Sequence, residues 1–437
     1  MGPAAALAIA SMALTPPTES ALQEAVARGM AGRKGAVVVA DVATGRLLAH
    51  YRLETAATRL AAPGSTVKPF LLRALLESGK LEASTSLPCP RRLEIGGRRL
   101  NCTHPAAAFP LDPVTALAYS CNAYFARMAL RLEPAALARA FEQAGLAVLS
   151  GLAAKETPGS IRVAASAEEL QLQALGEAAI EVTPLGLLNA YRRLAALRRK
   201  AVPRLAPLFQ GLEAATEYGT AQLAQPASLK VAGKTGTSAA GHAWFAGYAP
   251  AQRPEIVLVV FVEQGRGGPG AAPVARAIFE AWARARAAVR QVTVRTGPQP
   301  RVVPLETYVE AVLAGECATF SSEEALKAMA VTARTWAFRH RGRHATEGFD
   351  FCDATHCQRV RLEGLSERLR AAVEATDGEM LWYGGAPAAA FHHGHCGGMT
   401  ESGANVWPDL HTPYLRSAND TFCVATGRSP WNSQVVK

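Results

Sequence analysis

Ser65 and Lys68 stand three positions apart and together have the chemistry for acyl transfer. A serine hydroxyl is a poor nucleophile until a neighbouring base removes its proton, and residues at this spacing share one face of a helix. Burial would lower the pKa of Lys68 and make its amine that base. Ser65 follows Pro63 and Gly64, so it would open the helix where backbone N–H groups stabilise developing negative charge. Taken alone, Ser65 would equally be a helix N-cap.

Two later segments supply the other parts of such a site. Ser120 and Asn122 are expected on a loop between helices, the hydroxyl as a proton relay and the amide as a substrate-orienting group. The third segment is a run of four residues at the end of a predicted strand: Lys234, Thr235, Gly236 and Thr237. Its lysine adds positive potential, its hydroxyls would hold a substrate carboxylate, and its glycine leaves room for an acyl group beside the strand. Singly, each segment is typical of a surface loop or a strand end, but in this order they predict a serine acyltransferase.

The elements that must position these residues are strands at both ends of the segment and helices between them. Alanine-rich stretches predict helices over most of 112–200, besides one from 66 to 76 and one near 272–290. Strands are expected at 36–41, 45–50, 229–234, 243–248 and 255–263. This order predicts an α+β fold with an antiparallel sheet and flanking helices.

Residues 30–291 resemble the transpeptidase domain of penicillin-binding proteins, within the serine DD-peptidase and β-lactamase superfamily. Besides the three segments above, the resemblance rests on residues 183–191, 218–221, 233–238 and 243–250. It implies that a D-Ala-D-Ala stem peptide acylates Ser65 and that the acyl group passes to an amine or to water. It also implies that β-lactam antibiotics acylate the same serine as inhibitors and that no cofactor is required. Transpeptidase and carboxypeptidase chemistry both stay open.

A β-lactamase is the alternative interpretation, because it shares these segments and adds a base that hydrolyses the acyl-enzyme quickly. Glu168 and Glu169 lie between the second and third segments. The run 167–171 around them is typical of an exposed helical face, which favours a penicillin-binding protein over a β-lactamase.

The last part of the chain has a different composition. Residues 303–437 carry five of the eight cysteines and seven of the ten histidines, which indicates a second, smaller α+β domain. Residues 303–425 resemble the stage II sporulation protein D family, peptidoglycan lytic transglycosylases also described as amidase enhancers. The resemblance rests on residues 303–316, 325–336, 351–358, 396–400 and 413–416. It places the family's catalytic acid on Glu316, followed here by Cys317 where many relatives carry methionine.

One carboxyl group suffices for the chemistry that this resemblance implies. Glycosidases generally use two carboxylates, whereas in a lytic transglycosylase the C6 hydroxyl of muramic acid attacks the anomeric carbon. Glu316 would act first as an acid and then as a base, and its apolar neighbours at 312–314 would raise its pKa. Without the resemblance, Glu316 would equally be a surface residue at a helix end. The run 392–395 is expected as a polar loop, with a place in the sugar cleft as the alternative.

Four residues have the types and spacing of a closed metal site: His344, Cys352, His356 and Cys357. A Cys₂His₂ tetrahedron would hold structural zinc and brace the loop beside the cleft. The alternative is a disulfide, either Cys352–Cys357 or one that involves Cys396 and Cys423. In the first domain, Cys89 and Cys102 flank a predicted hairpin that turns at 96–97. This hairpin would bring the two sulfurs nearly opposite, so a disulfide and two separately buried thiols are both open.

The length of 437 residues is too great for one ordinary domain, and 49% hydrophobic with 19% charged residues suits a globular protein. Residues 1–29 are expected as a signal or leader segment, because 4–14 are apolar, although no basic segment precedes them. Residues 292–302 include two prolines and are expected as a linker between the domains 30–291 and 303–437. No later run is long enough to predict a membrane span.

A net charge of +10 suits an acidic polymer such as cell-wall glycan, and nucleic acid is the weaker interpretation because no basic run carries interleaved aromatics. Together the resemblances predict an exported, extracytoplasmic enzyme of the periplasmic or cell-wall side. It would have two activities on peptidoglycan, a Ser65 DD-transpeptidase or carboxypeptidase and a Glu316 lytic transglycosylase. The alternative is a non-catalytic, wall-binding scaffold. The presence of Ser65, Lys68 and Glu316 favours the enzyme, since a binding module needs none of them.

Overall fold

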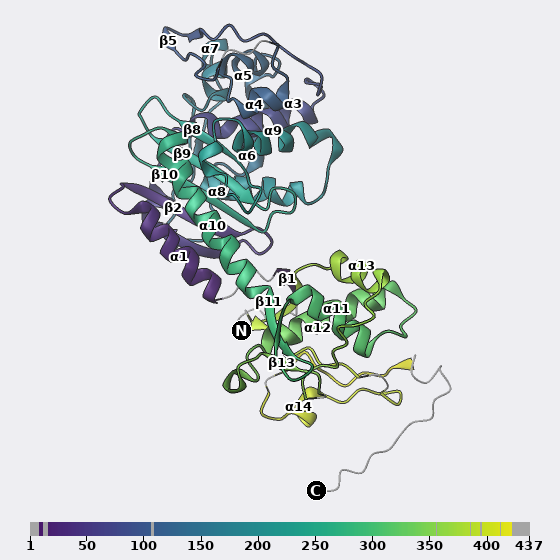
Figure 1. Ribbon diagram of the computed structural model, residues 1–437. Helices are drawn as coiled ribbons and strands as arrows, with labels where there is room; N and C mark the ends of the chain where they lie inside the picture. The colour runs from purple at the N-terminus through teal and green to yellow at the C-terminus, as the bar shows by residue number, and fades with distance from the viewer. Residues whose placement is uncertain are drawn as a thin grey trace. The chain divides into compact units, whose positions relative to one another are not determined.

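The chain divides into two compact units in the computed structural model (Figure 1), and each is described by itself. The first unit is Ala13–Ala287, and the second combines Met1–Met12 with Ala288–Lys437. The structure describes residues 8–11, 16–105, 109–354, 356–384, 386–393, 396–410 and 412–421. Cys423 and His395, both considered in the sequence analysis, lie outside these residues.

A five-stranded antiparallel sheet forms the middle of the first unit, in the order β3-β2-β10-β9-β8. Its strands are β2 (Gly35–Asp41), β3 (Leu47–Tyr51), β8 (Ala232–Thr237), β9 (Ala243–Ala249) and β10 (Ile256–Val262). β2, from the start of the unit, pairs with β10, from its end. The predicted α+β class with an antiparallel sheet and flanking helices is confirmed.

Both faces of this sheet are buried, and side chains of one strand alternate between two cores. In β10, Leu258 and Val260 pack with α1 (Pro16–Met30) and α10 (Ala272–Val289), which lie along the same face (Figure 1). Val259 belongs to the opposite core, which the other helices of the unit fill. Such two-sided burial explains why these strands are continuous apolar runs and not alternating ones.

The helices of the first unit fill most of the chain between β3 and β8. They are α2 (Leu53–Thr58), α3 (Lys68–Glu77), α4 (Pro113–Ala118), α5 (Asn122–Ala129), α6 (Pro134–Ala144), α7 (Ala167–Ala174), α8 (Pro184–Arg198) and α9 (Ala206–Glu217). Four shorter turns accompany them: η1 (Gly64–Val67), η2 (Pro203–Leu205), η3 (Gln222–Ala224) and η4 (Gly267–Ala271). Two small strand pairs complete the unit: the hairpin of β4 (Glu94–Ile95) and β5 (Arg98–Arg99), and the antiparallel pair of β6 (Ser160–Ile161) and β7 (Ile180–Glu181), between which α7 lies in the chain. The predicted hairpin turning at 96–97 is therefore present.

The helix α1 corrects the expected boundary of the leader. It falls within residues 1–29 for most of its length, yet Leu22 and Val26 are fully buried against the sheet, as is Met30 at its end. Its apolar residues recur at helical spacing and cover one face of the sheet. The compact unit thus includes α1 and does not begin at residue 30.

The second unit contains two three-stranded sheets. One joins β1 (Ala8–Ser11), β14 (Glu379–Tyr383) and β15 (Ala386–Pro387), and the other joins β12 (Arg301–Pro304), β11 (Gln291–Arg295) and β13 (Phe351–Cys352). Its helices are α11 (Leu305–Glu316), α12 (Glu323–Arg339), α13 (Glu367–Ala375) and α14 (Gly403–Val406), with the turn η5 (Ala345–Glu347). Among the described residues, no helix is long and apolar enough to cross a bilayer.

The linker expected at 292–302 is instead part of this second unit. β11 and β12 pair antiparallel, and Val292 and Val294 on β11 are buried. The two prolines, Pro298 and Pro300, lie in the connection between the strands, where a missing N–H breaks no ladder hydrogen bond. The burial of the alternating valines therefore favours the strand β11, and the prolines occur only in the connection between β11 and β12.

A buried arginine holds the helices of the second unit together. Arg334 on α12 is fully buried and pairs with Glu306 on α11, with Nη2 to Oε2 at 2.6 Å. The same guanidinium donates to the carbonyl oxygens of Val373 and Glu379. Removing one partner of such a buried pair typically costs about 3–5 kcal/mol. This ion pair fixes α11, which ends at Glu316.

Candidate active sites

Ser65 lies in a tight turn pressed against the strand β8. The turn η1 runs directly into α3, which begins at Lys68. Gly64 has a φ of +54°, and a Cβ there would lie 2.6 Å from the carbonyl oxygen of Thr237. A Cβ on Gly236 would likewise lie 2.6 Å from the carbonyl oxygen of Pro63. Gly236 therefore allows backbone to approach backbone, and its role in leaving room for an acyl group stays a prediction.

Lys68 is fully buried and joins the second predicted segment to the first. Its Nζ donates to the carbonyl oxygen of Ser120 at 2.9 Å, to Ser120 Oγ at 3.3 Å and to Asn122 Oδ1 at 2.6 Å. Burial lowers the pKa of Lys68 to about 8, against opposing attraction from Cys121, Cys102 and Glu177. The amine is thus closer to neutrality than an ordinary lysine, as a general base requires.

Ser120 has an unusual backbone conformation beside this lysine. Its φ of 56° falls in the left-handed region, which costs a residue with a side chain about 1–3 kcal/mol. This conformation turns both its carbonyl and its hydroxyl oxygen toward Lys68. The strain thus occurs at a residue that the sequence analysis predicted for the site, and the surrounding structure must maintain it.

The third predicted segment brings a second buried lysine into the site. Lys234 Nζ donates to the carbonyl oxygen of Thr235 at 3.0 Å and to Thr220 Oγ1 at 3.5 Å, and Thr235 Oγ1 donates to Thr220 Oγ1 at 2.9 Å. Burial, and then the charge of Lys68, holds the pKa of Lys234 well below its ordinary value. Thr237 is exposed, and its Oγ1 accepts from the N–H of Gly267. Thr220 was not predicted as a site residue, although it lies in the run 218–221 that supports the resemblance.

Glu177 is a second residue that the sequence analysis missed. It follows Gly176, whose carbonyl oxygen accepts the N–H of Gly64 at 3.0 Å, next to Ser65. Its carboxylate accepts from the N–H of Ala239 and from Arg98. Burial raises the pKa of Glu177, and these two donors oppose the rise.

Glu168 and Glu169, weighed above as deacylating bases, stand instead at the start of α7. Glu168 bonds the Ser166 hydroxyl, and Glu169 accepts from the N–H of Ala165 and from Arg162. These contacts are ordinary for a helix end, and α7 (Ala167–Ala174) agrees with the helix expected for 167–171.

The sulfurs of the first unit are arranged in a way that neither sequence expectation described. Cys89 and Cys102 are both free, so the disulfide between them is wrong. They are not separate thiols either, because their Sγ atoms gather with Cys121 Sγ and a His104 ring nitrogen within 4.8 Å of one another. Cys121 was missed because it stands inside the Ser-Cys-Asn segment, far along the chain from the hairpin.

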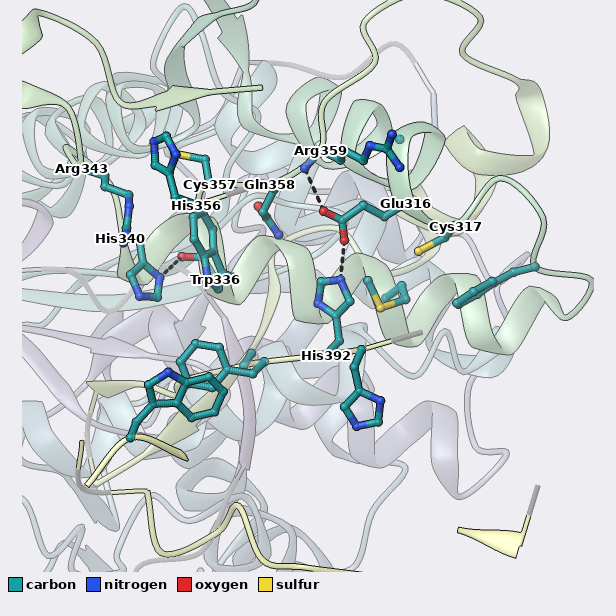
Figure 2. Close-up of a pocket in the computed structure, with 17 residues that line it drawn as sticks. Glu316, Cys317, Trp336, His340, Arg343, His356, Cys357, Gln358, Arg359 and His392 are labelled. Atoms are coloured by element: carbon teal, nitrogen blue, oxygen red, sulfur yellow. Dashed lines mark hydrogen bonds and ion pairs between the residues drawn. The ribbon is translucent and has the colours of Figure 1, made fainter. Parts of the chain in front are cut away.

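Glu316 occupies the C-terminal end of α11 in the second unit. Its Oε1 accepts the N–H of Arg359 at 2.8 Å, and its Oε2 pairs with His392 Nε2 (Figure 2). Burial raises the pKa of the Glu316 carboxyl, but the bonds from His392 and Arg359 outweigh it and leave the pKa below its ordinary value. The rise expected from the apolar neighbours at 312–314 is therefore wrong, because polar donors surround the carboxylate itself.

A cavity of about 680 Å³ opens in front of Glu316 (Figure 2). His392 and His393 line it, so the described part of the run 392–395 contributes to the cleft. A neighbouring cavity of about 530 Å³ shares both histidines with it, along with Phe391 and Trp407. These two rings stack with centroids 4.0 Å apart, and Trp407 is 41% exposed. The result is an extended groove with an aromatic wall.

The predicted metal ligands of the second unit converge. His344 Nε2 lies 3.1 Å from His356 Nε2 and 3.4 Å from Cys357 Sγ, and Cys352 Sγ lies 3.2 Å from His356 Nε2. Both cysteines are free, so the Cys352–Cys357 disulfide is wrong. The other ring nitrogen of His344 pairs with Glu347 at 2.5 Å, the kind of outer contact that orients a metal-binding histidine.

The Cys396 thiol donates to Asp420. A disulfide between Cys396 and Cys423 stays a prediction, because Cys423 lies outside the residues that the structure describes.

Residues 35–280 match the family model described as the penicillin binding protein transpeptidase domain. The chain belongs to this family. Residues 299–383 match a second model, the stage II sporulation protein, so the chain also carries a domain of that kind. One match falls on each of the two compact units.

Curated relatives support each part separately. The peptidoglycan D,D-transpeptidase PbpA of Mycobacterium tuberculosis is 27% identical over 279 residues, which cover 50% of this chain and 54% of that protein. The stage II sporulation protein D of Bacillus subtilis is 29% identical over 152 residues, or 31% of this chain and 41% of that one. The chain therefore spans 54% of the length of PbpA and 41% of the length of the sporulation protein.

Solved structures share the fold of the first unit. The D,D-transpeptidase domain of a peptidoglycan glycosyltransferase from Eggerthella lenta has a TM-score of 0.53 and 23% identity, covering 61% of this chain and 82% of that one. Pseudomonas aeruginosa PBP2 has a TM-score of 0.53 and 22% identity, covering 60% of this chain and 77% of that one.

Proposed function

We propose that the first unit catalyses acyl transfer on peptidoglycan stem peptides through a covalent intermediate on Ser65. The observation that carries the proposal is the buried Lys68, with its lowered pKa and its bonds to Ser120 and Asn122. The neutral Lys68 amine takes the Ser65 proton as the hydroxyl oxygen attacks the carbonyl carbon of the terminal D-Ala-D-Ala bond. Ser120 then passes a proton to the departing D-alanine amine, and an incoming amine or water releases the acyl group.

The strand β8 gives the stem peptide a place to bind. It ends the strand order of the sheet, so its outer edge is available for an extended peptide to pair along it. Lys234 supplies positive potential there, and Thr235 and Thr237 carry hydroxyls for the terminal carboxylate of the substrate. A β-lactam, which acylates the same serine, would occupy the same place.

Labelling with a fluorescent penicillin tests this proposal. The purified full chain and its Ser65→Ala variant would be incubated with the reagent and followed over hours. A stable adduct that Ser65→Ala lacks would support the acyltransferase. An adduct that fades within minutes would favour the β-lactamase, and a chain that never labels would contradict both.

The second unit, in this proposal, cleaves glycan strands as a lytic transglycosylase. Glu316 protonates the glycosidic oxygen, and the resulting carboxylate takes the proton of the muramic acid C6 hydroxyl as its oxygen bonds to C1. No water enters, and the product carries a 1,6-anhydro ring. Support comes from the position of Glu316 in a groove with the aromatic wall of Phe391 and Trp407, a surface suited to sugar rings. His392 pairs with the Glu316 carboxyl group, which must donate the proton, and so holds its orientation in the groove.

Mass spectrometry distinguishes this reaction from the alternatives. Purified glycan strands, with and without stem peptides, would be incubated with the full chain and with Glu316→Gln. An anhydro product is one water lighter than a hydrolysis product, and the variant should not form it. Binding to the strands with no product from either protein would favour the scaffold.

Structural zinc fits the convergent donors of the second unit. Two thiolates and two imidazoles would fill all four positions of a tetrahedral ion, so the metal would brace the fold and leave no position for substrate. The segment that it would hold ends just before Gln358 and Arg359. Gln358 accepts the Tyr308 hydroxyl, and the N–H of Arg359 holds Glu316. Because His356 and Cys357 also line the cavity of Glu316, the metal would steady Glu316 through a segment of the cavity wall.

The setting of the proposed chemistry is the extracytoplasmic wall. Penicillin-binding proteins act on peptidoglycan, and both matched families concern this polymer. The net charge of +10 favours association with an acidic mesh. We therefore propose an exported enzyme whose transpeptidase domain comprises 16–287 and whose sporulation protein D-like domain begins near 288.

A further inference from the structure

A cluster of three cysteines and one histidine lies beside the acyl-transfer site, and the acyl-transfer chemistry above makes no use of it. Its members come from three stretches of chain around the β4–β5 hairpin and the start of α5: Cys89, Cys102, His104 and Cys121. The Sγ atoms of Cys89 and Cys121 are 3.4 Å apart, those of Cys102 and Cys121 are 3.7 Å apart, and Cys89 Sγ is 3.4 Å from His104 Nε2. Ligands about 2.3 Å from a tetrahedral zinc ion are separated by about 3.8 Å. The donor spacing is close to that of such a site.

The surroundings of the four donors also match those of metal ligands. Each sulfur accepts a backbone N–H at 3.4 Å, Cys89 from Arg91, Cys102 from Ala123 and Cys121 from Tyr124. Hydrogen bonds of this kind support thiolates that bind metal.

The ring orientation of His104 is set in the same manner. Its Nδ1 lies 2.7 Å from the carbonyl oxygen of Pro105, which only accepts, so Nδ1 carries the hydrogen. The neutral ring then presents the lone pair of Nε2 to the sulfurs.

A disulfide does not account for the cluster. Bonded sulfurs lie about 2.05 Å apart, well below the separations here, and three thiols cannot all pair. Cys102, His104 and Cys121 are buried, as the ligands of a closed structural site would be. We propose that Cys89, Cys102, His104 and Cys121 bind a structural zinc ion, and that this ion holds the Ser120–Asn122 segment in the conformation that serves Lys68.

The second part of the proposal follows from where Cys121 stands. It separates Ser120 and Asn122, the two residues that bond Lys68 Nζ. A zinc ion on Cys121 would tie this segment to the hairpin, and Asn122 already donates to the carbonyl oxygen of Leu100 there. The strained Ser120, with its φ of 56°, needs such reinforcement to persist. Zinc would therefore control how readily Ser65 is acylated while touching no substrate.

Metal content tests the site itself and does not depend on the acyltransferase proposal. The full wild-type chain should hold one zinc ion more than its Cys89→Ser variant, measured by elemental analysis after gel filtration. Cobalt(II) loaded in place of zinc should show the visible bands of a tetrahedral thiolate site, weakened in Cys89→Ser. Equal metal content in the two proteins, or a mass that reveals a disulfide among these cysteines, would overturn the site.

The rate of acylation tests whether zinc controls the reactivity of Ser65, and this part of the proposal rests on the proposed function. Cys89→Ser should react with fluorescent penicillin about tenfold more slowly or worse. Cys352→Ser, which removes a ligand from the other cluster, is the matched control and should label at the wild-type rate. Cys89→His keeps a donor and should restore both zinc and labelling, which separates loss of metal from general misfolding. If Cys89→Ser held no zinc at this site yet labelled at the wild-type rate, zinc would not control the acylation of Ser65.

Discussion

Lys68 is the residue at which pH should act on acyl transfer. Burial lowers its pKa to about 8, and the groups that face it are Lys234, Glu177, Cys102 and Cys121. Only the neutral amine accepts a proton, so the acylation rate should rise with pH, about tenfold per unit below this pKa, and then level off. The measurement is the second-order rate of penicillin labelling between about pH 6 and 9. Lys68→Arg stays charged and should be slow throughout, whereas a flat wild-type profile would remove Lys68 as the base.

His392 should set the upper pH limit of glycan cleavage, because Glu316 must be protonated to donate to the glycosidic oxygen. Burial raises the pKa of Glu316, and the bond from His392 is the largest of the contributions that lower it. In His392→Ala that bond is lost, so the pKa of Glu316 should rise and the alkaline limb of the pH profile should move to higher pH. His393→Ala, which alters the same cavity without contacting Glu316, should leave the limb in place. Cleavage rates of both variants across pH check this, and an unshifted limb in His392→Ala would contradict it.

The residues that could be predicted from the sequence are those whose partners lie within a few positions. Two short patterns are of this kind, because their spacing alone predicts which side chains lie close together. They are Ser65 with Lys68, and Cys352 with His356 and Cys357. The sequence analysis missed Thr220 and Glu177 because their partners come from other segments of the chain. It missed the cluster of Cys89, Cys102, His104 and Cys121 for the same reason. A cysteine such as Cys121, inside a catalytic motif, carries no local sign that two others lie beside it.

At the scale of elements, the approach of η1 to β8 depends on two glycines. Gly64→Ala would force a side chain into a left-handed conformation, which costs about 1–2 kcal/mol, and would also place Cβ 2.6 Å from the carbonyl oxygen of Thr237. We expect a loss of unfolding free energy larger than this strain alone, together with slower penicillin labelling. Gly79→Ala is the control, since its φ is +69° but nothing lies within 4 Å of its Cβ. The measurements are urea unfolding and the penicillin-labelling rate of both variants. Equal losses of unfolding free energy and equal labelling rates in Gly64→Ala and Gly79→Ala would show that the contact with β8 is unimportant.

The elements themselves were largely predictable where burial dominates. The apolar runs of β2, β9 and β10 and the helical spacing of α10 follow from a sheet covered on both faces. The errors arose where two signals competed. Pro298 and Pro300 suggested a linker. Val292 and Val294 are nevertheless buried, and they belong to the strand β11. The apolar start of the chain suggested a leader as far as residue 29, but α1 buries its own apolar face against the sheet.

For the whole molecule, the decisive question is whether the two proposed activities are separate. Every residue assigned to acyl transfer lies in the first unit, and every residue assigned to glycan cleavage lies in the second. Because neither set includes a residue of the other unit, the effects of removing Ser65 and Glu316 should be additive. Ser65→Ala should keep full cleavage of isolated glycan strands, and Glu316→Gln should keep full penicillin labelling.

The double variant completes this experiment on intact cell walls. It should bind the walls as the wild type does, in a manner weakened by salt because the attraction is electrostatic, yet release no product and form no cross-link. If either single variant abolished both activities, the two sites would be coupled and the division by unit would fail. If the double variant still released anhydro products, cleavage would belong to another carboxylate than Glu316. Measuring labelling and cleavage on the same four proteins therefore separates a bifunctional enzyme from a scaffold with one active domain.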